Sequence, residues 1–437
     1  MINHLKARAR ALLPKNQFAR GVSVLVGGTA SAQALSILAT PLLTRLYSPE
    51  DFGLLATYSS LLALINVVSS LRYELSIAVA KNDDEAIALV WLCFVLVAIS
   101  AGLTALGVGL LGTQLVNWLH QPKLKSLLWL IPIAVLLSGL YQPLSYWAIR
   151  HQQFSLLAQT KFRQSFVGVV IKLVAAHLGT IGLLLGVVVE QSVGSWQILS
   201  RHPLHCRVSS RNTNHLTRVH QVKARLSVTF SSYSYIALPN TLAGVLNSLY
   251  PAIFSILLTS IGAVDSLGML YLAKKVIDAP SAILSKSIGD VFMAKISQTK
   301  DELVFSACIR NILIMAVVSS FFLVPYALAL SFIGPMLFGS IWEPRISNYF
   351  FLLVPTSVAQ LSVGSTGMAF ITAGLNNHGL FAQAGMLLTR LSPIFLILFL
   401  KRPVEMLPIG ICLGLLVGYL FYGSVLILSL RRKYAVF

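Results

Sequence analysis

Charged side chains inside long apolar runs are the residues of this sequence most able to do chemistry. Lys172 and Glu190 lie in two neighbouring apolar runs, joined by a short turn near Thr180. If both runs are helices, a rise of 1.5 Å per residue places the two side chains at depths that differ by about 3 Å. One interpretation is an ion pair that stabilises the helices. The other is that Lys172 binds an anionic substrate or that Glu190 exchanges a proton, because burial raises the pKa of a carboxyl group.

A second group of charges lies in the apolar run that contains Lys274, Lys275 and Asp278. Lys274 and Asp278 are four residues apart, so a helix places them on one face, and Asp278 is a candidate for ion coupling or for an ion pair. Lys275 lies about 100° further round the helix. Arg390 lies in the middle of another apolar run, with no acidic residue near it in the sequence. Ionisable residues at bilayer depth are costly, so we interpret Lys274, Lys275 and Arg390 as binding residues for an anionic substrate.

Arg72 and Glu74 lie near the expected inner end of another apolar run. They are candidates for an inner gate, and the alternative is a pair that extends its charges into the membrane interface. The sequence contains no nucleophile–base arrangement, no Walker loop and no metal-ligand spacing. We therefore expect no catalytic residue, no metal and no cofactor. The four cysteines show no paired spacing, which argues against a disulfide framework.

The apolar runs that carry these charges are long enough to cross a membrane. Hydrophobic types make up 56% of the 437 residues and charged types 11%, whereas a soluble protein carries about 25% charged residues. A span needs about 20 apolar residues, and its backbone must pair within a helix or a closed barrel. Continuous runs exclude the barrel, so the sequence predicts an all-α membrane protein with about 12 transmembrane helices. The spans are expected at 21–44, 54–78, 87–112, 126–147, 162–179, 182–200, 232–258, 266–288, 306–331, 349–373, 380–400 and 406–429.

The formal net charge is +19, which in a soluble protein would suggest nucleic acid. In a membrane protein, lysine and arginine gather in the cytoplasmic loops and set the topology. Most of the 33 lysines and arginines fall on the side of the predicted spans that also holds both termini. We therefore expect cytoplasmic termini, contact with membrane lipids and no nucleic-acid partner.

The longest hydrophilic stretch divides the predicted spans into six and six. It predicts an N-terminal six-helix bundle at 1–200, a basic cytoplasmic linker at 201–231 and a C-terminal six-helix bundle at 232–437. The linker either retains these residues in the cytoplasm or contacts anionic lipid or a partner. PEDFGLLATY and VDSLGMLYLA place Gly53 and Gly268 215 residues apart, which indicates a parallel repeat of two halves.

Several stretches resemble a known family. PLLTRLYSPEDFGLLATYSSLLALI (41–65) and LRYELSIAVAKNDDEA (71–86) are similar to the beginning of the polysaccharide biosynthesis proteins known as Wzx-type oligosaccharide flippases. In the second half, the similar stretches are LPNTLAGVLNSLYPAI (238–253), SLGMLYLAKKVIDAPSAILSKSIGDVF (266–292) and FGSIW (338–342). The resemblance extends over the whole chain and is weak at 201–231.

The resemblance implies membership of the multidrug/oligosaccharidyl-lipid/polysaccharide exporter superfamily, with two six-helix bundles around a central cavity. It implies transport of undecaprenyl-diphosphate-linked oligosaccharide, such as an O-antigen repeat unit, to the outer leaflet of the bacterial inner membrane. The partners it implies are this lipid-linked substrate and other glycan-assembly proteins, and we expect a monomer. The cationic side chains Lys172, Lys274, Lys275 and Arg390 suit a diphosphate headgroup.

Two other functions remain open from the sequence. A multidrug exporter of the same superfamily would share the fold, but cationic drugs favour acidic and aromatic binding residues rather than lysine and arginine. A membrane glycan polymerase or ligase would carry a large outer loop with catalytic side chains, and the predicted outer loops are short. The charges within the spans also argue against a scaffold without transport activity.

Overall fold

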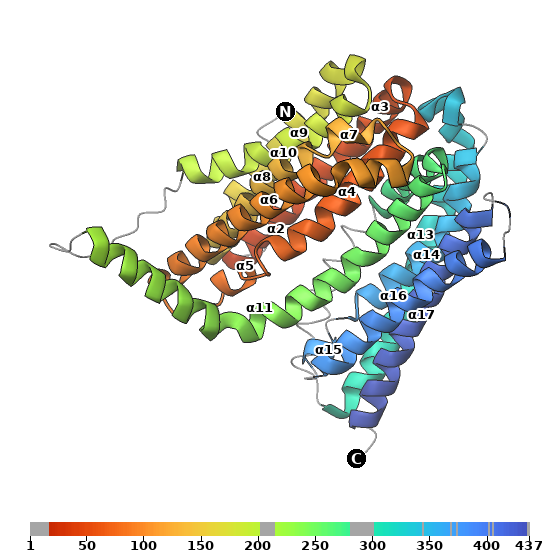
Figure 1. Cartoon of the computed structure of the whole chain (residues 1–437). Coiled ribbons are helices and arrows are strands. Elements are labelled where there is room, and N and C mark those ends of the chain that lie inside the picture. The colour runs from red at the N-terminus through yellow and green to blue at the C-terminus, as the bar shows by residue number, and fades with distance from the viewer. Residues whose placement is uncertain are drawn as a thin grey trace, which may run out of the picture. The chain divides into compact units, whose positions relative to one another are not determined.

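The computed structural model describes residues 17–201, 215–279, 301–342, 345–367, 369–372, 375–400, 403 and 406–434. Its regular elements in these ranges are helices (Figure 1). The helices are α2 (Gln17–Leu38), α3 (Thr40–Leu46), α4 (Pro49–Ser69), α5 (Glu74–Ile77), α6 (Asp83–Leu119), α7 (Leu124–Leu127), α8 (Leu130–Arg150), α9 (Phe154–Val174), α10 (Thr180–Arg201), α11 (His215–Ser260), a helix at 264–279, α13 (Asp301–Phe338), α14 (Arg345–Gly364), α15 (Ala369–Thr372), α16 (Asn376–Phe399) and α17 (Leu407–Tyr434).

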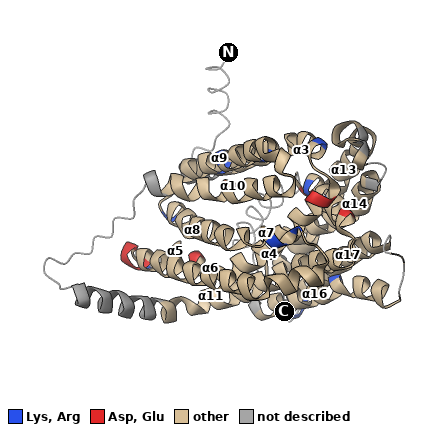
Figure 2. Ribbon diagram, turned by 45° about the horizontal axis from the view of Figure 1, so that its top comes forward, with Lys and Arg blue, Asp and Glu red and all other residues tan. Residues whose placement is uncertain are grey.

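The described chain contains ten helical segments that are long and apolar enough to cross a membrane. Two further helices, α9 and the helix at 264–279, take the places of the other two predicted spans, and the second is described only as far as residue 279. The sequence also predicts a kink at Pro280, a residue that lies outside the described ranges. Figure 2 shows how few charged residues these helices carry. The predicted class of an all-α, multi-pass membrane protein is confirmed.

Packing divides the chain into two compact units. The N-terminal unit comprises Met1–Ala39, Leu62–Val116 and Pro122–Leu242, and the C-terminal unit comprises Thr40–Leu61, Asn117–Gln121 and Ala243–Phe437. Helices α4 and α11 therefore contribute residues to both units. The predicted linker at 201–231 is only partly described: α11 already begins at His215, and residues 202–214 lie outside the described chain. The predicted domain boundaries stay predictions.

Small residues bring the helices of the N-terminal unit into close contact. In this unit α9 packs against α2 and α10, and α8 packs against α10 (Figure 1). A Cβ atom added to Gly28 of α2 would lie 2.7 Å from the Cα atom of Ala158 in α9. The Ser165 hydroxyl of α9 donates a hydrogen bond to the Ala32 carbonyl of α2 at 2.7 Å. Contacts through small residues and hydroxyl groups are typical of helices that pack within a membrane.

The end of α4 differs from the prediction. The second span was expected to continue to residue 78, but α4 ends at Ser69 and the next membrane-spanning segment begins at Asp83. The backbone turns at Leu71 and Arg72, whose φ angles of 49° and 59° lie in the left-handed region. The short helix α5 follows from Glu74. The expected span was therefore too long at this end, and 70–82 connects two spans.

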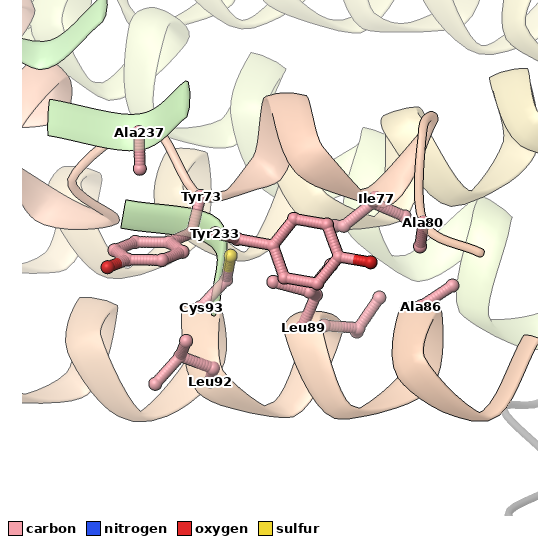
Figure 3. Close-up of a cluster of buried hydrophobic side chains, with 10 residues drawn as sticks. Tyr73, Ile77, Ala80, Ala86, Leu89, Leu92, Cys93, Tyr233 and Ala237 are labelled. Carbon is pink, nitrogen blue, oxygen red and sulfur yellow. The ribbon is translucent and has the colours of Figure 1, made fainter. Parts of the chain in front are cut away.

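A buried apolar cluster surrounds this turn in the N-terminal unit (Figure 3). Its members come from the connection after α4, from α6 and from α11: Tyr73, Ile77, Ala80, Ala86, Leu89, Val90, Leu92, Cys93, Tyr233 and Ala237. The Tyr73 hydroxyl donates to the Phe230 carbonyl at 2.9 Å, and the Tyr233 hydroxyl donates to Glu85 Oε2 at 2.6 Å. These two tyrosines attach the connection and α6 to α11.

In the C-terminal unit, the start of α4 crosses the start of the helix at 264–279. A Cβ atom added to Gly53 would lie 2.9 Å from the carbonyl carbon of Val264, and one added to Gly268 would lie 2.9 Å from that of Pro49. Each glycine therefore packs on the residue four positions before the other. An offset of 215 residues relates Gly53 to Gly268 and Pro49 to Val264, so the two contacts are equivalent under that offset. This symmetric contact supports the repeat that the sequence indicates.

Two hydroxyl pairs continue the packing of α4 within the C-terminal unit. Thr57 and Thr259 are joined at 2.8 Å between their hydroxyl oxygens, and Ser60 and Ser255 at 2.5 Å. Both partners of α4 lie on α11. Hydrogen bonds between hydroxyl groups satisfy polar side chains where water is absent, so they suit a contact within the bilayer.

Candidate functional site

Lys274 and Asp278 form the centre of a polar cluster in the C-terminal unit. Lys274 Nζ lies 2.5 Å from Asp278 Oδ2, across one turn of the helix at 264–279. Two side chains of α14 complete the contacts: the Ser357 hydroxyl donates to Asp278 Oδ1 at 2.8 Å, and Gln360 Oε1 lies 3.5 Å from Lys274 Nζ. The positive charge of Lys274 is therefore balanced within the protein. Lys275, the next residue, is half-buried.

Arg390 of α16 is a buried cation, with only 7% of its surface exposed. Its guanidinium carbon lies 4.5 Å from the centre of the Tyr419 ring of α17 and 5.5 Å from that of the Tyr250 ring of α11. Its Nε atom has no hydrogen-bond partner, and no carboxylate of the described chain lies within ion-pair distance. Helix α17 makes room for the side chain with Gly418, where an added Cβ atom would lie 3.1 Å from Nε.

The two tyrosine rings offset only part of the cost of burying this charge. A desolvated cation–π contact contributes about 2 kcal/mol. Removing an ion from water still costs several kcal/mol after the protein relaxes. Two rings, with no counter-ion among the described residues, thus leave the Arg390 guanidinium with an unused hydrogen-bond donor at Nε and a net positive charge. An anion that enters this site would accept a hydrogen bond from the guanidinium and neutralise its charge.

Arg390 and the Lys274 pair have neighbours in common on α17 and α11. The charge of Lys274 acts on the Cys412 thiol, and Arg390, Cys412 and Tyr419 act on the Tyr250 hydroxyl. Arg390, Lys274 and Asp278, with the side chains that contact them, therefore form one group, here called the cationic cluster. Two cations and one carboxylate give the three charged members an excess of one positive charge. The cluster is the best candidate in the described chain for binding an anion.

In the N-terminal unit, the structure brings Lys172 and Glu190 together. Lys172 Nζ lies 3.1 Å from Glu190 Oε2, with 12% and 36% of the two side chains exposed. Each side chain crosses a glycine of the other helix: a Cβ atom on Gly186 would lie 2.9 Å from Lys172 Cε, and one on Gly168 would lie 2.6 Å from Glu190 Oε2. This close fit between α9 and α10 is what a structural ion pair requires. A role of Lys172 in substrate binding, or of Glu190 in ion coupling, stays a prediction.

Arg72 and Glu74 also lie near each other, but in unlike surroundings. Arg72 Nη1 is 3.7 Å from Glu74 Oε1, with the arginine side chain 31% exposed and the glutamate side chain completely buried. Burial raises the pKa of the Glu74 carboxyl above its usual range, and the hydrogen bond from Ser70 and the charge of Arg72 oppose this effect only in part. The gate that the sequence suggests at these two residues stays a prediction.

The sequence reasoning missed the neutral partners of the charged residues. Tyr250, Tyr419, Ser357 and Gln360 all lie in apolar spans far in sequence from the charges that they contact. The sequence does show that these spans contain side chains able to form hydrogen bonds. Their spacing does not indicate which charged residue each of these side chains contacts. Within the described ranges, no three histidine, cysteine, aspartate or glutamate side chains lie close enough to hold a metal ion.

Comparison with known proteins identifies relatives at two levels. The sequence profile of the family described as "Polysaccharide biosynthesis protein" matches residues 42–347. No curated protein matches the chain.

Among solved structures, the chain is similar to a multidrug resistance MATE family transporter of the MOP superfamily in an inward-facing conformation. The TM-score is 0.64 at 13% identity, with 92% of this chain and 96% of that chain covered. An outward-facing MATE transporter gives a TM-score of 0.52 at 14% identity, covering 97% of each chain. The Vibrio cholerae MATE transporter VcmN gives 0.50 at 17% identity, covering 95% of this chain and 99% of that chain. These similarities establish the fold of the chain.

Proposed function

Because the chain belongs to the polysaccharide biosynthesis protein family, we propose that it is a flippase for undecaprenyl-diphosphate-linked oligosaccharide. The family match and the transporter fold support a multi-pass membrane protein of the flippase and exporter class. The proposed substrate is an O-antigen-type repeat unit, and the proposed location is the bacterial inner membrane with both termini in the cytoplasm. Transport by alternating access and the absence of enzymatic activity belong to the same proposal.

The single observation that supports an anionic substrate is the buried, unpaired environment of the Arg390 side chain within the described chain. Its guanidinium group is buried between two tyrosine rings and makes no ion pair with a described carboxylate. A diphosphate group carries negative charge and several acceptor oxygens, and guanidinium groups bind such oxygens in paired hydrogen bonds. Lys274, which is already paired with Asp278, is a weaker candidate for this contact than the sequence suggested. The lipid tail can remain in the bilayer while the headgroup is transferred.

A multidrug exporter is the second candidate, because two of the similar structures are described as multidrug resistance MATE family transporters. They share the fold with this chain but little sequence, so their substrates do not carry over. A buried arginine with no counter-ion in the part of the chain that the structure describes repels a cationic drug. The cationic cluster therefore favours the anionic lipid-linked substrate.

The test replaces Arg390 by glutamine in a host that depends on this protein for its surface glycan. A hydrogen bond to a charged group contributes about 1.5–3 kcal/mol, so loss of the guanidinium should weaken substrate binding roughly 10- to 150-fold. We expect less surface glycan and an accumulation of lipid-linked oligosaccharide, with an unchanged amount of protein in the membrane. Arg390→Lys keeps the charge and should retain part of the activity.

A matched control is Arg431→Gln, which removes an exposed arginine from the last turn of α17. It should leave glycan display unchanged. Normal display in Arg390→Gln would contradict an anion site at this residue. A loss of drug resistance without any change in glycan display would favour the multidrug exporter instead.

A further inference from the structure

The proposed function makes no use of the most deeply buried carboxyl group in the described chain. The Glu74 side chain begins α5, in the connection between α4 and α6, and has no exposed surface. Its Oε1 atom has no hydrogen-bond partner, and its Oε2 atom accepts a hydrogen bond from the Ser70 hydroxyl at 2.5 Å. An ionised carboxylate in such a place would leave one oxygen both charged and without a donor, which is strongly unfavourable. A protonated carboxyl group avoids that charge.

Among the described residues, the groups that face Glu74 do not supply a matching positive charge. From the same connection, Arg72 lies 3.7 Å away, but its side chain is 31% exposed, so water screens its charge. From α6, the neighbouring titratable group is the Cys93 thiol, and from α8 it is the Tyr146 hydroxyl. Both are neutral groups under ordinary conditions. Tyr73 and Ile77, on either side of Glu74 in the chain, belong to the apolar cluster of Figure 3.

The backbone beside Glu74 is held in an uncommon conformation. Leu71 and Arg72 both have positive φ angles, of 49° and 59°, and neither is glycine. Such conformations persist only where the surrounding contacts enforce them, and they are frequent in segments that change conformation. The hydrogen bond between Ser70 and Glu74 encloses these two residues. The Glu74 side chain therefore contributes directly to keeping the turn closed.

From the burial, the missing hydrogen bond and the enclosed turn, we propose that Glu74 is a proton-binding residue that is neutral in this conformation and whose ionisation releases the turn 70–74. In the proposed step, the O–H bond of the carboxylic acid breaks and the proton passes to water that reaches the turn as it opens. No oxidation or other reactant is involved. The role in a transport cycle rests on the proposed function, but proton binding at Glu74 does not.

The first test measures proton binding without any substrate. The purified full-length protein and its Glu74→Gln variant are unfolded by heat in one detergent over a series of pH values. A carboxyl group whose pKa is raised by folding stabilises the protein below its ordinary pKa of 4.5, and this stabilisation is lost as the pH rises through the raised value. We therefore expect the melting temperature of the wild type to fall relative to that of Glu74→Gln as the pH rises above 4.5.

An ionised Glu74 would give the opposite dependence of the melting temperature on pH. If Glu74 is ionised and paired with Arg72, the wild type should gain stability relative to Glu74→Gln as the pH rises, and that result would overturn the proposal. Arg72→Gln gives an independent check. It should leave the pH dependence nearly unchanged if Glu74 is neutral, and should strongly destabilise the protein if it removes the partner of a buried charge.

A second test concerns release of the turn. Glutamine resembles the protonated acid in shape and cannot ionise, so Glu74→Gln should reach the membrane in normal amount and lose surface glycan display. Glu74→Asp retains an ionisable group and should keep part of the display. Normal display in Glu74→Gln would refute the release step. Because the thermal measurement needs no substrate, its result stands whether or not Arg390→Gln supports the proposed glycan transport.

Discussion

Replacing Gly268 by alanine adds one methyl group where the helix at 264–279 meets the start of α4. The added Cβ atom would lie 2.8 Å from the amide nitrogen of Gly53 and 2.9 Å from the carbonyl carbon of Pro49. Both atoms belong to the backbone of a helix, so neither can rotate aside as a flexible side chain could. The two helices would have to move apart along their contact.

The magnitude follows from two opposing effects. Overpacking of a well-packed contact costs about 1–3 kcal/mol, and rigid backbone partners place this site at the upper end. Alanine is the better helix former by about 0.5–1 kcal/mol. The net loss of stability is therefore about 2–2.5 kcal/mol, which for a unit of this size lowers the melting temperature by roughly 4–10 °C.

The assay is thermal unfolding of the detergent-solubilised protein, followed by the loss of its monodisperse elution peak. Gly334→Ala is the matched control, because Gly334 lies within α13 of the same unit and the atoms nearest to its added Cβ lie 3.5 Å or more away. This control should be neutral or slightly stabilised. Gly53→Ala should behave like Gly268→Ala, and the double variant should lose less than the sum of the two because both changes disturb one contact.

A melting temperature of Gly268→Ala equal to that of the Gly334→Ala control would refute the reasoning. It would mean that the two helix starts do not meet at their glycines. Strong destabilisation by Gly268→Ala with no effect of Gly53→Ala would retain the close contact but contradict its symmetry. The structural support for the repeat would then be lost.

Two smaller predictions concern single contacts. Lys172→Gln and Glu190→Gln should each be less stable than the double variant by about 1–3 kcal/mol, because each single change leaves a partly buried charge without its partner; equal melting temperatures of all three variants would contradict an ion pair. Trp342→Phe should lower the free energy of unfolding by about 1 kcal/mol, because it removes the 2.9 Å hydrogen bond from Nε1 to the Thr44 carbonyl. The substitution keeps an aromatic ring beside Phe52. Thermal unfolding measures this loss, with Trp196→Phe, which changes an exposed tryptophan, as the control.

The sequence by itself determined the class of protein and the residues worth examining. Apolar runs of membrane-spanning length require helices whatever their neighbours are, because the bilayer leaves the backbone no other partner. The repeat stays a prediction, although Gly53 and Gly268, which indicated it, lie at one symmetric helix contact in the structure. Lys172 and Glu190 could be matched in depth because one short turn joins their helices.

The tertiary structure decided the surroundings of each charge. The turn after Ser69 contains neither glycine nor proline, so local sequence predicted a longer span, and packing around Glu74 set the left-handed residues instead. Arg390 meets Tyr250 and Tyr419 from other helices, and Lys274 is neutralised by Asp278 with help from α14. The sequence of a single span does not indicate which distant side chain will face it, because the rotation and crossing angle of a helix are set by packing against its neighbours. The number and kind of intramembrane charges were therefore readable from the sequence, whereas their availability for a substrate or a proton depended on the folded helices.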